Sequence, residues 1–185
     1  ARVCFSAVST SVISGRQKPK CAAVTPSSPG SVVAEHGAGL VLMHMQGEPR
    51  TMQTDPTYED VVEDVTSLLL EGVSLAEGAG VDRSSICLDP GIGFGKTLAH
   101  NLALLSGLSL FHGLGLPVLV GASRKRFIGT LSGVEVARER VSGSIAAALA
   151  AVAQGAHIVR VHDVAETRQA LTVWQAATQG VLSES

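Results

Sequence analysis

Short apolar runs alternate with longer amphipathic stretches along the chain from residue 33 onward. The apolar runs are four or five residues long and stop at glycine, proline or charged residues, as buried strands do. The longest amphipathic stretch carries Val61, Val65, Leu69 and Val73 at nearly helical spacing and ends at glycines. The pattern predicts strands at residues 40–43, 86–89, 117–120 and 157–161, and helices at residues 57–79, 99–113, 138–153 and 164–177.

A fourfold alternation of strand and helix is the pattern of a parallel sheet with helical crossovers. In such folds, ligands bind at the carboxyl ends of the strands. The four predicted strands run into the polar or glycine-rich sequences HMQGEPR, DPGIGFGK, GASRKR and RVHD. The sequence therefore predicts an α/β protein with a parallel (β/α) barrel of TIM type. A complete barrel takes roughly 250 residues, so this chain has room for about four β-α units, a partial barrel.

The first 33 residues follow neither a helical nor a strand period. They hold Arg2, Arg16, Lys18 and Lys20, and the first acidic residue of the chain is Glu35. Frequent serine and proline make the segment typical of a flexible chain, and it also fits an organellar transit peptide or a leader foreign to the fold. We therefore divide the chain into an irregular leader at residues 1–33, which need not be ordered, and a partial barrel at residues 34–185.

The composition of the chain argues against two classes of partner, nucleic acids and membranes. The chain has 185 residues, roughly one domain, and its 14 basic and 16 acidic residues give a net charge of -2. It therefore has no overall positive field for nucleic acid or an anionic membrane, and its apolar runs are far shorter than the roughly 20 residues of a membrane span. Its three cysteines form no CxxC pair, which favours a reducing, cytoplasmic setting. We expect neither nucleic-acid nor membrane partners.

The most informative stretch is DPGIGFGK at residues 89–96. Its Gly95-Lys96-Thr97 ending resembles a phosphate-binding loop, but Pro90 stands where that loop needs glycine, and the glycines do not fit a dinucleotide fingerprint either. What remains is the carboxylate of Asp89 at a strand end, followed by three glycines that allow close approach of a ligand. An ionised carboxylate presents two acceptors in one plane, which suits a heterocycle edge with adjacent N–H donors. The alternative is that Asp89 caps the next helix.

Two further strand ends carry cations. Arg124, Lys125 and Arg126 follow the third strand, and they are either a solvated basic run or the partners of a local anion, since cations at a helix start oppose its dipole. Arg160 and His162 alternate on the fourth strand, so they share a face and could clamp a phosphate. The alternative for that end is a surface pair between an arginine and an aspartate.

Other candidate residues favour ordinary structural roles. Met43 is more often a core residue than a ligand contact, and Cys87 is expected to be an inert buried thiol. The histidines at positions 36, 100, 112 and 157 lack ligand spacing. The sequence also contains no HExxH motif or carboxylate cluster, so it predicts no metal site held by protein ligands.

The four strand ends, in this order, resemble dihydropteroate synthase. The segments LVLMHMQGEPRTMQ, LDPGIGFGK, LVGASRKRFIG and SGSIAAALAAVAQGAHIVRVHDV look like the carboxyl-terminal half of that family, and the resemblance covers residues 33–177. It implies a (β/α)8 barrel of folate biosynthesis, a transferase that joins 4-aminobenzoate to 6-hydroxymethyl-7,8-dihydropterin pyrophosphate with the help of Mg2+. It also implies a homodimer and competitive inhibition by sulfonamides.

The resemblance assigns roles residue by residue. Asp89, Lys125 and Arg160 would be the catalytic residues, and loss of pyrophosphate would precede attack by the weak arylamine nucleophile. Stabilising the departing anion is then the main electrostatic task. The implied pterin contacts are Met43, Asp89, Gly121, Lys125 and Arg160; the implied aminobenzoate contacts are Gly93, Phe94, Lys125 and Arg126; and pyrophosphate would be held by Arg160 and His162.

The chain also departs from the family. The family's first strand, with a magnesium-binding asparagine in an NVTPDSFSDGG-type segment, has no counterpart here, and Arg126 replaces a frequent serine. One alternative is therefore a truncated, non-catalytic pterin-binding half-barrel. Another is the pterin-binding domain of a folate-dependent corrinoid methyltransferase, although that chemistry has no pyrophosphate for the SRKR and RVHD ends to hold.

Overall fold

Four parallel strands, each followed by a helix, form the framework of the described chain. The computed structural model describes residues 2–8, 22–23, 29–48 and 50–180. The strands are β3 (Gly39–Met45), β4 (Ile86–Asp89), β5 (Leu119–Val120) and β6 (Ile158–Val159). Pairing is parallel between β3 and β4 and between β5 and β6, and a parallel bridge from Leu88 to Val118 joins the two pairs. Strand order therefore follows chain order, as a (β/α) barrel requires.

Helix α2 (Val61–Gly78) shows how the sequence builds one of these units. Asp60 caps it, because its carboxylate accepts hydrogen bonds from the amides of Val62 and Glu63. The helix thus begins four residues later than the pattern predicted. Its fully buried residues Val65, Leu69 and Val73 recur every fourth position and belong to the same core as Leu40 and Leu42 of β3.

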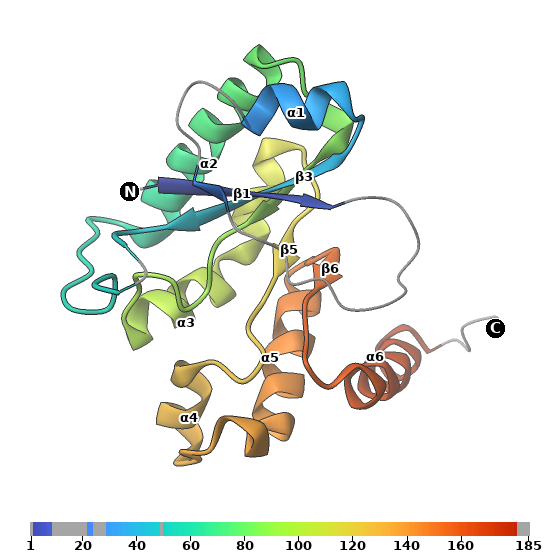
Figure 1. The fold of residues 1–185 in the computed structure, drawn as a ribbon. Coiled ribbons are helices and arrows are strands. Elements are labelled where there is room, and N and C mark those ends of the chain that lie inside the picture. Colours follow the sequence, from blue (N-terminus) through green and yellow to red (C-terminus); the bar gives the residue numbers. More distant parts are fainter. Residues whose placement is uncertain (1, 9–21, 24–28, 49, 181–185) are drawn as a thin grey trace.

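The remaining helices cover the chain towards its carboxyl end. Helix α3 (Leu98–Ser106) stops at Gly107 and a 3-10 segment, Leu108–Leu114, follows, so the helix predicted at residues 99–113 is in fact two elements. Helix α4 (Arg126–Ser132) was not predicted, and α5 (Val141–Ala153) and α6 (Val164–Gln179) match their predicted positions closely. In Figure 1, α4, α5 and α6 lie below the sheet containing β1 and β3, on the side away from α1 and α2.

Regular structure also occurs within the predicted irregular leader. Strand β1 (Arg2–Val8) pairs antiparallel with β3 over seven residues, from Arg2 opposite Met45 to Val8 opposite Gly39, and with the short β2 (Ala22–Ala23). Helix α1 (Pro29–Glu35) begins before the expected boundary at residue 33. These elements correct the expectation of an irregular segment where they occur, while residues 9–21 and 24–28 lie outside the described residues. Within the described chain, no helix combines the length and apolar character needed to cross a membrane.

Candidate active site

Asp89 is the last residue of β4 and is only 1% exposed. One carboxylate oxygen accepts a hydrogen bond from the Gly91 amide at 2.8 Å, and the other lies 3.2 Å from Nη2 of Arg160. Burial raises the pKa of this carboxyl, while the Gly91 amide and the nearby Lys125 and Arg160 charges act in the opposite direction. The capping alternative is wrong, because Thr97 caps α3. Asp89 is instead a fixed carboxylate facing a guanidinium.

Gly121 gives the Arg160 guanidinium room to reach Asp89. A Cβ atom at position 121 would lie 3.0 Å from Nη2 and 3.2 Å from Nε of Arg160, tighter than an ordinary contact. The guanidinium therefore lies against bare backbone at the end of β5. The alternative for the RVHD end, a surface pair between an arginine and an aspartate, is also wrong for Arg160. The nearby Asp163 instead pairs with Arg124, whose Nε and Nη2 both contact its carboxylate.

The loop after Asp89 is pressed against the end of β3. Gly91, Gly93 and Gly95 have φ values of 70°, 79° and 62°, a region that favours glycine. A Cβ atom at Gly91 would lie 1.8 Å from the carbonyl oxygen of His44, and one at Gly95 would lie 2.3 Å from that of Gln46. Gly91 and Gly95 thus permit a close backbone approach to the end of β3, whereas a Cβ atom at Gly93 would meet the Lys125 side chain at 2.9 Å.

Side chains from several elements fix the conformation of this loop. Four consecutive carbonyl groups each accept a hydrogen bond from a different side chain. The donors and acceptors are Lys125 Nζ to Ile92, Gln53 Nε2 to Gly93 at 2.7 Å, Lys96 Nζ to Phe94 at 3.1 Å, and Tyr58 Oη to Gly95 at 2.7 Å. The sequence pattern singled out the glycines and Lys125, but it gave no signal for Gln53 or Tyr58.

Lys125 connects the parts of the site. It immediately precedes α4, and its Nζ lies 4.2 Å from the centroid of the Phe94 ring, within reach of a cation–π interaction. Burial lowers the pKa of its ammonium group to about 8, although Asp89 opposes that shift. Lys125 lines two neighbouring cavities, one of about 260 Å³ and one of about 380 Å³.

The smaller cavity gathers residues from three strand ends. His162 contacts Ser123 Oγ through both its amide at 3.2 Å and its Nδ1 at 2.9 Å, which fixes the imidazole beside the end of β5. Cations and a histidine thus surround a space next to Asp89, as the predicted anion site requires. The lining residues are Phe94, Gly121, Ser123, Lys125, Arg160, Val161 and His162.

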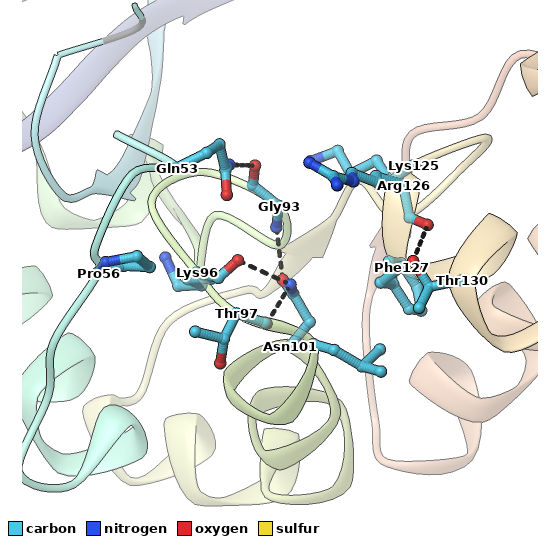
Figure 2. A pocket seen from close by; sticks show the side chains of 11 residues that line it. Gln53, Pro56, Gly93, Lys96, Thr97, Asn101, Lys125, Arg126, Phe127 and Thr130 are labelled. Carbon is cyan, nitrogen blue, oxygen red and sulfur yellow. Dashed lines mark hydrogen bonds between the residues drawn. The ribbon is translucent and has the colours of Figure 1, made fainter. Parts of the chain in front are cut away.

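The larger cavity lies between the glycine loop and α4 (Figure 2). Gly93, Lys125 and Arg126, three of the residues predicted to contact aminobenzoate, line it, and Arg126 is exposed there. Gln53 and Asn101 were missed by the sequence analysis; Asn101 accepts a hydrogen bond from the Gly93 amide at 2.6 Å (Figure 2). Phe94 lines the smaller cavity, so the predicted residues divide between two adjoining spaces.

Met43 lies opposite Asp89 in the pairing of β3 with β4 and is 5% exposed. It packs with Met45, Met52 and Phe94 in a small apolar cluster apart from the main core. Met43 is therefore buried, as a core residue would be. It nevertheless lies beside the predicted pterin site, and its contact with a ligand stays a prediction. Cys87 has a pKa raised to about 11 by burial, consistent with an unreactive thiol.

The comparisons with known proteins place this arrangement in a family. Residues 24–162 match the family described as "Pterin binding enzyme". The chain belongs to this family. The chain is 50% identical over 152 residues to dihydropteroate synthase of Escherichia coli strain K12, which covers 81% of the chain and 54% of that relative. It is 53% identical over 141 residues to the Neisseria meningitidis serogroup B enzyme, covering 75% of the chain and 50% of that relative.

Solved structures agree with the sequence relatives. Dihydropteroate synthase of Stenotrophomonas maltophilia superposes on this chain with a TM-score of 0.79 at 49% identity, covering 83% of this chain and 58% of that one. The resemblance predicted from the strand ends is confirmed, and with it the TIM-barrel fold of the family. The chain spans about half the length of the curated relatives that it matches.

Proposed function

We propose that this chain provides the carboxyl-terminal half of a dihydropteroate synthase active site. The reaction would condense 4-aminobenzoate with 6-hydroxymethyl-7,8-dihydropterin pyrophosphate to give 7,8-dihydropteroate and pyrophosphate. The observation that carries the proposal is the position of Lys125, whose side chain lines both the cavity beside the Asp89–Arg160 pair and the cavity beside Arg126. Two adjoining spaces that share one ammonium group suit two substrates that must react with each other.

The Asp89 carboxylate would bind the pterin. Its fixed orientation lets it accept hydrogen bonds from the adjacent N–H donors of an aminopyrimidine edge, and such charge-assisted bonds are among the stronger ones. Met43 would supply an apolar contact, and Gly121 would let the ring lie close to the backbone. The Thermus thermophilus enzyme has been solved in complex with 6HMPPP, which supports assigning a pterin to the equivalent face here.

The larger cavity would bind 4-aminobenzoate, with Gly93 in its wall, Phe94 in the adjoining smaller cavity, and Lys125 and Arg126 as cations for the carboxylate. Solved structures of the Xanthomonas albilineans enzyme with 4-aminobenzoic acid and of the Yersinia pestis enzyme with a sulfonamide drug complex support this class of ligand. Sulfonamides would compete for the same space. Arg126, which stands where the family often has serine, gives this chain a second cation there.

Pyrophosphate departure is the step that these residues would assist most. Arg160 and His162 line the smaller cavity, so they would stabilise the negative charge that develops on the leaving group before the arylamine attacks. The resemblance also implies Mg2+. Among the residues that the structure describes, no three His, Cys, Asp or Glu side chains gather closely enough to hold a metal ion, so we assign no residue to magnesium and route no step through it.

We further propose that the four β-α units form half of the barrel and that the protein is a homodimer. An apolar groove of about 780 Å³ between α3, α4 and α5 supports the homodimer, with Leu102 and Leu131 exposed along it.

The relatives named above are all dihydropteroate synthases, which favours this reaction over methyl transfer to a corrinoid. A non-catalytic half-barrel differs from the proposal only in turnover.

Calorimetric titration with a 6-hydroxymethylpterin pyrophosphate analogue tests the proposal. Asp89→Asn keeps the shape of the side chain but replaces an acceptor with a donor, and we expect it to weaken binding about tenfold or more. Asp82→Asn is the matched control, since Asp82 is an exposed capping residue before β4. A folded wild-type chain that does not bind the analogue would refute the proposal. Binding without pyrophosphate release in the presence of both substrates would identify the non-catalytic alternative.

A further inference from the structure

Lys96 has no part in the function proposed above, yet it is one of the most buried charged residues described. It is 3% exposed, and its Nζ lies 2.9 Å from Nδ1 of His44 and 3.1 Å from the carbonyl oxygen of Phe94. The resemblance of Gly95-Lys96-Thr97 to a phosphate-binding loop is therefore misleading. The ammonium group is held between β3 and the glycine loop by these two contacts, and Lys96 also lines the larger cavity.

The surroundings of Lys96 are unfavourable for a charge. Within the described chain, no carboxylate lies within ion-pair distance of its Nζ, and burial lowers the pKa of the ammonium group to about 7. The titratable or charged groups facing it are His44 of β3, Tyr58, Asp89 of β4 and Lys125 before α4. His44 is itself fully buried, with a pKa lowered to about 3, so it is the neutral partner. A buried cation with neutral partners does not by itself stabilise a fold.

Lys96 does determine where the Phe94 carbonyl lies. His44 belongs to β3, so the two contacts of Lys96 tie the glycine loop to that strand. The Phe94 ring is the surface on which the Lys125 ammonium rests, 4.2 Å from the centroid. Gly93, the preceding residue, faces the larger cavity and would meet the Lys125 side chain at 2.9 Å if it carried a Cβ atom. A shift of the Phe94 carbonyl would therefore change both the pocket wall and the support of Lys125.

We propose that Lys96 is a positioning residue for the aminobenzoate pocket. By bridging His44 and the Phe94 carbonyl, it sets the distance between the loop residues Gly93 and Phe94 and the Lys125 ammonium. The identity of the pocket's ligand rests on the proposed function, whereas the bridge itself does not. This role explains why a lysine occupies a position where an apolar residue would be better tolerated.

The test compares Lys96→Met with the wild type. Methionine fills a similar volume without donors or charge, so the free energy of unfolding at pH 7 should stay equal or rise. The amides of residues 91–96 should exchange with deuterium faster, because their loop has lost its tie to β3. Affinity for 4-aminobenzoate, measured with the pterin analogue present, should fall about tenfold, the loss expected for one hydrogen bond to a charged group. Affinity for the pterin analogue should change less than about twofold.

Arg83→Met is the matched control, because Arg83 is an exposed cation paired with Glu77 far from the loop. It should change neither local exchange nor binding. An unchanged rate of deuterium exchange at residues 91–96 in folded Lys96→Met would overturn the proposal. A lower free energy of global unfolding in Lys96→Met would also overturn it, because that result would indicate a purely structural role. If the wild-type chain binds no 4-aminobenzoate, the proposed function fails, and the local exchange alone still decides whether the bridge exists.

Discussion

Alanine substitutions at three glycines test how closely the glycine loop is pressed against β3. Gly91, Gly95 and Gly133 have similar φ values of 70°, 62° and 72°. Their surroundings differ, because a Cβ atom would meet a backbone oxygen at 1.8 Å at Gly91 and 2.3 Å at Gly95, but nothing within 4 Å at Gly133. Gly133→Ala therefore measures the cost of the backbone conformation alone, which we expect to be about 1–2 kcal/mol.

The other two substitutions add a steric cost to the conformational one. At Gly91 the His44 carbonyl and the loop must separate by about 1 Å or more, which breaks the packing of the loop on β3 and typically adds 1–3 kcal/mol. Gly91→Ala should thus lower the free energy of unfolding by about 2–5 kcal/mol, and Gly95→Ala by an intermediate amount. Urea unfolding followed by circular dichroism gives all three values. Equal losses for the three variants, or a larger loss at Gly133, would show that the loop does not lie against the strand.

Two further predictions concern single residues of the site, Lys96 and Gly121. The pKa of Lys96 is about 7 in the folded chain against 10.5 when unperturbed, so the unfolded state binds more protons between these values and stability should rise with pH across that window. From pH 7 to pH 9 the wild type should gain about 2 kcal/mol more than Lys96→Met, as read from urea midpoints, and parallel profiles would contradict the lowered pKa. Gly121→Ala should leave stability unchanged but push the Arg160 guanidinium away from Asp89. Calorimetry should then show about tenfold weaker binding of the pterin pyrophosphate analogue, and full affinity would mean that Arg160 does not act from this position.

The sequence predicted the β-α framework because its signals are local. Apolar runs that end in glycine located β3 and β4, and the spacing of Val65, Leu69 and Val73 located α2. Placement at the carboxyl ends of β4 and β6, on either side of β5, then brought Asp89 and Arg160 together, although they are 71 residues apart. Strand β1 was missed because its pairing depends on β3, and α4 was missed because its seven residues are too few to show a helical period.

The supports of the glycine loop could not be predicted, for a physical reason that bears on the half-site itself. Hydrogen bonds from Gln53, Tyr58 and Lys125 to the loop carbonyls span 40, 37 and 33 residues, and no local pattern encodes such pairs. All of these donors nevertheless belong to the described chain, as does the Lys96 bridge to β3. The loop that places Asp89, Gly93 and Phe94 is therefore braced by side chains of the described residues. For this reason we expect pterin recognition by Asp89 to survive in this chain even if turnover does not.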